Sequence, residues 1–346
     1  MAKADQSLMI KTLRLLLKFG IAAAVLVLLF RGDSRKIAES LRDFRYVYLI
    51  PAALFYLAHI GVCAWRWRVL AKLTGVEMSG GAALSLTMQG YFFSLVIPGG
   101  AIGGDVIKMA AVSRRLDNGT RTEGAFSVLM DRIIGMLALF VLALALMVPA
   151  RRLFCGIRFP DMPEKLTGEV IFLLVLLLCV AGLTAGIAVF FYRKLEKIPG
   201  ISPLLRFSDR HTGGMITRIK AAIDTYGGNW RTLVKLTVLS IFGVHLMTVV
   251  PMFFLLAGAN CSGGALTVIA ALTFGNIAGL IPLFPGGIGG RDVTVAALLV
   301  SGGLAAGRAE AAQLLYTAIM VVCCLSGGLF FIFDPGRKLS PSGGGK

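Results

Sequence analysis

Apolar residues along this chain gather into long uninterrupted runs, and the short segments between them carry most of the charge. Six of these runs are long enough to cross about 30 Å of hydrocarbon as a helix. They are residues 13–30, 47–65, 124–148, 169–191, 232–257 and 309–333. The pattern predicts an all-α polytopic membrane protein with six full transmembrane helices.

Two further apolar runs, 81–98 and 265–285, each lead into Pro-Gly-Gly. Proline and glycine break a helix and leave backbone N–H and C=O groups without partners inside the segment. In hydrocarbon such groups are tolerated only where they are buried in protein or face a water-filled cavity. We therefore expect two re-entrant, broken-helix elements, at 81–113 and 265–301, beside the six full spans.

The two broken elements are copies of one pattern. Pro98-Gly-Gly-Ala-Ile-Gly-Gly-Asp105 recurs as Pro285-Gly-Gly-Ile-Gly-Gly-Arg-Asp292. With the N-terminus inside, the first copy is reached from the inside and the second from the outside, which is typical of inverted repeats in transporters. The interpretation is a single transmembrane domain, 1–346, with halves 1–148 and 169–333 and a flexible tail, 334–346. A tight glycine-mediated helix crossing is the structural alternative.

Two connecting segments have helical periodicity. Apolar residues line one face of 34–48 and one face of 215–230. Both fit helices that lie in the membrane interface, or loop helices that pack on the protein's own surface.

Composition and charge agree with the bilayer as solvent. The chain is 57% apolar and only 15% charged, with a net charge of +17, and its mean hydropathy is +0.81. The basic residues lie in short loops beside apolar spans, which argues against a soluble nucleic-acid-binding face. Segments assigned to the inside carry roughly twice as many Lys and Arg as those outside, so both termini are expected in the cytoplasm and the protein in the cell inner membrane. We interpret 13–30 as a retained first helix, not a signal peptide.

Ionisable residues at membrane depth are the first candidates for function, because each is costly unless paired or hydrated. Six such residues occur at or near the broken elements and in the span 124–148: Asp105, Lys108, Asp131, Arg132, Arg291 and Asp292. The free amides of the two breaks, at a helix N-terminus, suit a phosphate or carboxylate. The candidate substrate-binding set therefore also includes Gly99, Gly100, Gly103, Gly104, Gly286, Gly287, Gly289 and Gly290. An alternative is that Asp131 and Arg132 only pin the two repeats together.

Other polar residues in the spans give weaker signals. Gln89 and Asn276 both lie nine residues before the proline of a break, and are candidates to line the cavity. His59 and His245 are isolated and are interpreted as packing residues. The segment 65–68, Trp-Arg-Trp-Arg, ends a span and is interpreted as an interfacial anchor. None of the six cysteines has metal-ligand spacing, and a disulfide between Cys155 and Cys261 is left open.

The motifs 98–108, 127–132 and 285–292 together resemble the lysylphosphatidylglycerol synthase transmembrane-region family, also known as flippase-like or uncharacterised family 0104 membrane proteins. The resemblance covers almost the whole chain. Lys108 stands where the family often has arginine, and Asp292 stands where glutamate is usual. The resemblance implies movement of lipids or lipid-linked molecules between leaflets. The chain ends without a soluble aminoacyl-transfer domain, so we do not expect it to make lysyl lipid itself.

Three functions follow as hypotheses. The first is a lipid flippase or transporter that carries a phospholipid or lipid-linked headgroup through a polar cavity between the inverted repeats. The second is a membrane transferase acting on a lipid-linked substrate, although no nucleophile motif, metal cluster or nucleotide-binding motif is present. The third is a non-transporting partner of a separately encoded lipid-modifying enzyme. We expect a membrane lipid as the ligand, no cofactor, no metal, no catalytic residue, and a homo-oligomer as one option.

Overall fold

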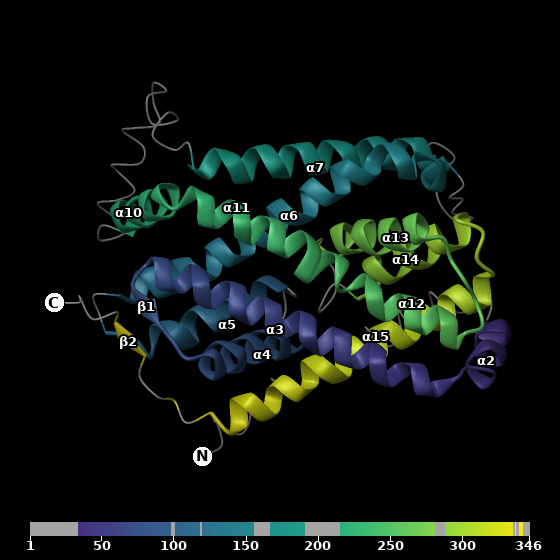
Figure 1. Cartoon of the computed structure of the whole chain (residues 1–346), viewed down its shortest axis with the longest axis horizontal. Helices are drawn as coiled ribbons and strands as arrows, with labels where there is room; N and C mark the ends of the chain where they lie inside the picture. Colours follow the sequence, from purple (N-terminus) through teal and green to yellow (C-terminus); the bar gives the residue numbers. More distant parts are fainter. Residues whose placement is uncertain are drawn as a thin grey trace, which may run out of the picture.

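The computed structural model describes residues 34–97, 101–117, 120–155, 167–190, 215–280, 288–334, 336 and 339–341. In this part of the chain, five helical segments are long and apolar enough to cross a membrane, and they run roughly along the long axis of the molecule (Figure 1). They are α3 (Leu49–Leu73), α6 (Arg121–Cys155), α7 (Gly168–Phe190), the continuous segment α11 to α12 (Trp230–Gly258) and α15 (Ala306–Ile332). The expected all-α polytopic membrane fold is confirmed, and the run 13–30 lies outside the described residues.

The span expected at 232–257 is continuous but not regular. It consists of α11 (Trp230–Leu239), a π-helical turn η3 (Ser240–Leu246) and α12 (Val249–Gly258). The Met247 amide donates to the Phe242 carbonyl at 3.1 Å, a bond one residue longer than in an α-helix. Such turns occur mostly as single insertions in α-helices, frequently at functional sites. This turn faces α3 and α6 in the middle of the bundle.

Both broken elements form helical hairpins. The first consists of α4 (Gly80–Val96) and α5 (Ala101–Ser113), and the second of α13 (Ala265–Ala278) and α14 (Gly290–Ser301). In each hairpin the two short helices pack against one another. The helices end and restart where proline and glycine interrupt the apolar runs, as expected. The interrupting residues themselves, 98–100 and 281–287, lie outside the described residues.

The two hairpins start from opposite ends of the bundle. The first begins at β1 (Val76–Glu77), directly after the C-terminal end of α3. The second begins after α12, whose last residue, Gly258, accepts a 2.9 Å bond from the Arg45 amide, just before the N-terminal end of α3. Figure 1 shows α4 and α5 towards one end of the molecule and α13 and α14 towards the other. This is the re-entrant arrangement that the repeated motif predicts.

The order of elements repeats along the chain. An amphipathic helix, a span, a hairpin and a span follow one another from α2 (Ser34–Arg42) to α6, and again from α10 (Met215–Gly228) to α15. Contacts between the two series are reciprocal, because α4 packs on α15 while α13 packs on α6. The central spans α3 and α12 pack on each other. A pseudo-two-fold exchange of the two series therefore describes the core of the fold.

The amphipathic helices α2 and α10 pack on the protein itself. Ile37 of α2 is buried, and a Cβ atom placed on Gly307 of α15 would lie 2.9 Å from Lys36 Cβ. Tyr226 of α10 is fully buried, and its hydroxyl donates to the Leu70 carbonyl at 3.0 Å. The buried face of each helix therefore packs on the protein's own surface, which was one of the two options that the sequence left open.

The described residues of the tail contact the rest of the chain, and the expected flexibility of 334–346 stays a prediction. The Asp334 carboxylate forms an ion pair with Arg115 and accepts a 2.8 Å hydrogen bond from Gln89 Nε2. Strand β2 (Ser340–Pro341) pairs antiparallel with β1. Burial raises the pKa of Asp334, but the hydrogen bonds from Gln89 and Gly336 and the charge of Arg115 outweigh it, so the pKa lies below its ordinary value.

The described charged loops lie at the two ends of the bundle. Loops assigned to the same side of the membrane from their basic residues lie at the same end. The loops after α3 and α5 meet the tail at the β1 end, through Arg115 and Asp334. At the other end, Arg308 Nη1 donates to the Asn260 carbonyl at 2.5 Å, and Ser301 Oγ donates to the Leu153 carbonyl at 2.5 Å. That the β1 end faces the cytoplasm stays a prediction from the excess of basic residues.

Gly104 is expected to be essential for closing the first hairpin. A Cβ atom there would lie 2.9 Å from Ser94 Cβ and against the Gly90 carbonyl oxygen, so α4 and α5 would have to move apart. Gly104→Ala is expected to lower the free energy of unfolding by about 1–3 kcal/mol, the usual cost of overpacking. The measurement is unfolding in detergent micelles.

Gly61→Ala on α3 is the matched control, because nothing lies within 4 Å of a Cβ atom at that position. Alanine also has the better helix propensity, so this variant should be neutral or slightly stabilised. Equal stability of the two variants would contradict the close contact of α4 with α5.

Candidate functional site

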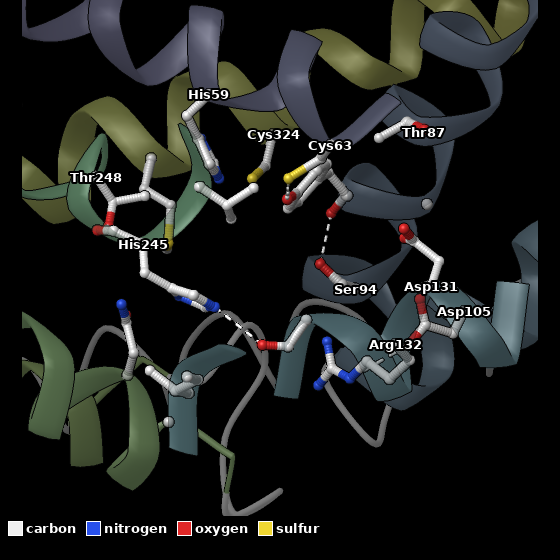
Figure 2. Close-up of a pocket in the computed structure, with 18 of the residues that line it drawn as sticks. His59, Cys63, Thr87, Ser94, Asp105, Asp131, Arg132, His245, Thr248 and Cys324 are labelled. Carbon is white, nitrogen blue, oxygen red and sulfur yellow. Dashed lines mark hydrogen bonds and ion pairs between the residues drawn. The ribbon is translucent and has the colours of Figure 1, made fainter. Parts of the chain in front are cut away.

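A cavity of about 280 Å³, lined by charged, polar and apolar residues, lies where the two hairpins approach each other. Its lining comes from α3, α4, α5, α6 and η3, and from α13, α14 and α15. Figure 2 shows His59, Cys63 and Cys324 along one wall, with His245, Ser94 and Arg132 around the opposite side of an open centre. Both halves of the repeat therefore contribute to one site in the middle of the bundle.

Arg66 of α3 connects three elements at this site. Its Nε donates to Asp131 Oδ1 at 2.8 Å, and its Nη2 donates to the Asp131 carbonyl at 3.3 Å. Its Nη1 donates to Ser240 Oγ at 2.9 Å. The arginine side chain is 6% exposed and the aspartate side chain 13%, so the ion pair is largely out of solvent. Because the π-helical turn sets the position of Ser240, it completes the hydrogen bonding of this guanidinium group.

A second, looser ion pair lies beside the first. Arg132 Nε of α6 is 3.7 Å from Asp105 Oδ2 of α5, and each side chain is about one third exposed, at 33% and 31%. The distance exceeds that of a direct charge-assisted hydrogen bond. Arg132 therefore has guanidinium donors that can reach a ligand in the cavity.

Lys108, one turn after Asp105 on α5, is 5% exposed and also lines the cavity. Its Nζ lies 3.8 Å from the centre of the Trp67 ring, a cation–π contact. The indole N–H of Trp67 donates to Ser127 Oγ at 3.1 Å, which fixes the ring. Among the described residues, no carboxylate lies within ion-pair distance of Lys108.

Arg291, at the start of α14, brings a cation from the second hairpin. Its Nη2 donates to Asp292 Oδ1 at 3.0 Å and to Thr317 Oγ1 at 3.1 Å, and its Nη1 contacts Met320 Sδ at 2.6 Å. The Arg291 Nε atom is buried and has no hydrogen-bond partner among the described residues. Arg291 lines the cavity, and a buried donor without a partner in such a residue is a candidate to bind an incoming acceptor.

Asp292 holds this arginine and caps the helix. Its carboxylate accepts from the Gly289 amide at 2.7 Å and from Gln313 Nε2 at 2.6 Å. Gly289 has φ 97°, a conformation that favours glycine. The carboxylate of the chain therefore occupies the helix end that the sequence suggested for a substrate anion, and Asp292 itself does not line the cavity.

The structure brings together part of the expected set. Asp105, Lys108, Asp131, Arg132, Arg291 and Asn276 line the cavity. The described glycines of the two motifs, Gly103, Gly104, Gly289 and Gly290, do not, whereas Gly90, Gly135 and Gly279 do. Gly99, Gly100, Gly286 and Gly287 lie outside the described residues. That any of these residues binds substrate stays a prediction.

Gln89 lies elsewhere, which corrects its expected place in the cavity lining. Its side-chain amide donates to Ser85 Oγ at 3.2 Å and to Asp334 at 2.8 Å, so it binds the end of α15. The equal spacing of Gln89 and Asn276 before the breaks therefore does not give them equal surroundings.

The cavity lining also includes residues that the sequence pattern indicated for packing, His59 and His245, or for an interfacial anchor, Arg66. His59 and Arg66 of α3 line it, as does His245 of η3, whose Nε2 lies 2.9 Å from the Gly135 carbonyl oxygen. A helical signal was available, because His59, Cys63 and Arg66 follow the spacing i, i+4, i+7 and share one face. The cysteines carry no disulfide in this structure, and Cys155 and Cys261 are free thiols.

The charges of the cavity lining are unbalanced. Four cations line it, Arg66, Lys108, Arg132 and Arg291, against the carboxylates of Asp105 and Asp131. With Asp292 included, three ion pairs form and one cation remains. The excess of basic residues in the lining suits an anion, because each buried cation is costly without a counter-charge.

Comparison with known proteins shows one family whose model matches most of the chain, and one similar curated protein. The family model described as "Lysylphosphatidylglycerol synthase TM region" matches residues 15–328. A UPF0104 membrane protein from Pyrococcus horikoshii is 26% identical over 128 residues. That alignment covers 37% of this chain and 38% of the length of the archaeal protein.

Proposed function

We propose a function from the premise that this chain belongs to the family of the lysylphosphatidylglycerol synthase TM region. It is a multi-pass membrane protein that moves a phospholipid or lipid-linked headgroup between the two leaflets. The headgroup binds in the polar cavity between the hairpins, and the acyl chains stay in the bilayer. The observation that carries the proposal is a cationic cavity lined by both re-entrant hairpins of an internal repeat.

The reciprocal architecture supports alternating access. Each hairpin packs on the last span of the other series, so a rocking motion of one series against the other would move both hairpins together. The buried cations lower the cost of bringing a lipid phosphate to mid-membrane, because each ionisable group there is costly without a counter-charge. The motion would expose the cavity to each leaflet in turn.

The proposal includes the placement of the protein. It resides in the cell inner membrane with the β1 end and both termini in the cytoplasm. It leaves the lipid covalently unchanged.

Reconstitution tests this function. The purified chain is placed in liposomes that contain a fluorescent phospholipid, and leaflet exchange is followed by the fraction of label that dithionite can reduce from outside. We expect protein-dependent exchange above empty liposomes. Chemical change of the lipid would support the transferase hypothesis instead. A folded protein with neither activity would support the role as partner of a separate enzyme.

A further inference from the structure

The cavity has a net charge that defines the class of headgroup it takes. Each of the three carboxylates at the site has an arginine: Asp131 has Arg66, Asp105 has Arg132, and Asp292 has Arg291. Lys108 is the remaining cation of the lining, and it forms no ion pair with a described carboxylate. It is 5% exposed, and the Trp67 ring on which its ammonium lies has no net charge.

A buried ammonium in the middle of a membrane protein is stable only with an anion or water to compensate it. Cation–π contact with Trp67 contributes attraction but does not neutralise the charge. Arg291 Nε, from the opposite hairpin, is a second donor for which the described residues provide no partner. Lys108 and Arg291 line the same cavity from opposite hairpins, so both residues adjoin the space that a headgroup would occupy.

We infer that the cavity selects a lipid headgroup with a single net negative charge, a phosphodiester whose remaining part is uncharged. A zwitterionic headgroup adds an ammonium, and every carboxylate at the site is already engaged by an arginine. Its ammonium would have to displace Arg132 from Asp105, the longest of the three pairs at 3.7 Å, at the cost of freeing another cation. Hydroxyl groups of an uncharged headgroup meet no such competition.

This inference rests on the proposed function, since it names the substrate class of the same site, but it is tested by binding and not by transport. The purified full chain is incubated with equal amounts of phosphatidylglycerol and phosphatidylethanolamine of identical acyl chains. Native mass spectrometry then gives the ratio of the two complexes. We expect phosphatidylglycerol to be preferred roughly tenfold or more, the range of one hydrogen bond to a charged group.

Variants at Lys108 assign the preference to its charge. Lys108→Met should bring the ratio close to one, while Lys108→Arg should keep it. Lys235→Met is the matched control, because Lys235 is exposed on α11 and does not line the cavity. Thermal unfolding of each variant confirms that the protein is folded. An unchanged ratio in folded Lys108→Met, or equal binding of the two lipids by the unaltered chain, would overturn the inference.

A competition experiment with a soluble anion distinguishes binding of a lipid headgroup from binding of free phosphate, since both present phosphate oxygens. Inorganic phosphate at millimolar concentration is added to the complex with phosphatidylglycerol. Retention of the lipid supports the lipid assignment, and its displacement by phosphate overturns it. The two proposals also fail separately. Preferential binding of phosphatidylglycerol without leaflet exchange would contradict the proposed function but not this inference. Leaflet exchange with equal binding of the two lipids would contradict this inference but not the proposed function.

Discussion

Arg66→Met is expected to destabilise the protein by about 3–5 kcal/mol, the usual cost of removing one partner from a buried ion pair. The substitution leaves the Asp131 carboxylate, which is 13% exposed, without its cation, and leaves Ser240 Oγ without its donor. Three elements, α3, α6 and the π-helical turn, lose their shared polar contact at once. The free energy of unfolding can be measured by SDS titration in mixed micelles.

The double variant Arg66→Met with Asp131→Leu distinguishes a lost attraction from a stranded charge. Replacement of both members of a buried pair by apolar residues is often nearly neutral, so the double variant should recover most of the stability. Arg68→Met is the control, because Arg68 is exposed and its Nε donates to a backbone carbonyl, that of Met78, at 2.8 Å. A double variant as unstable as Arg66→Met would show that the carboxylate is not the source of the loss.

Arg291→Lys is expected to lower the rate of leaflet exchange by about 10- to 100-fold, corresponding to one hydrogen bond to a charged group. Lysine keeps a cation beside Asp292, so the buried carboxylate retains a counter-charge. It loses the planar fork and the buried Nε donor, which has no partner in the part of the chain that the structure describes. The exchange rate is measured in liposomes and normalised to the amount of folded protein.

Arg308→Lys provides the matched control, because Arg308 is exposed at the start of α15 and outside the cavity. Arg291→Ala is a poorer probe, since it would strand Asp292, which is 1% exposed, and so lower stability as well as exchange. Wild-type exchange by folded Arg291→Lys would remove the guanidinium donor from the mechanism.

The apolar runs predict the spans because membrane helices must satisfy their backbone internally, and hydropathy follows from that requirement. The break in each hairpin is equally local, since proline and glycine act on their own helix. The π-helical turn could not be predicted in this way. Nothing in Ser240–Leu246 distinguishes it from α-helix, and its place depends on the contacts of Ser240 with Arg66 and of His245 with α6.

The difference between local signals and signals that depend on helix packing also explains which site residues could be predicted. Six ionisable residues near the breaks are visible in the sequence because charge is rare at membrane depth. Arg66 was not predicted as a site residue, because its segment, 65–68, resembles an interfacial anchor. Helix α3 runs on to Leu73, beyond the expected end at residue 65, so Arg66 is buried while Trp65 is 51% exposed. Partners such as Asp131 for Arg66 depend on helix packing, which a single sequence does not specify.

The reciprocal contacts of the two element series have a consequence for conformations beyond the one described. Because α4 meets α15 as α13 meets α6, each series could adopt the internal geometry of the other without new kinds of contact. A conformation related by this exchange would interchange the roles of the two ends of the bundle around the cavity. Cysteine pairs placed where the two arrangements differ in distance would then report which orientation the protein occupies in a native membrane.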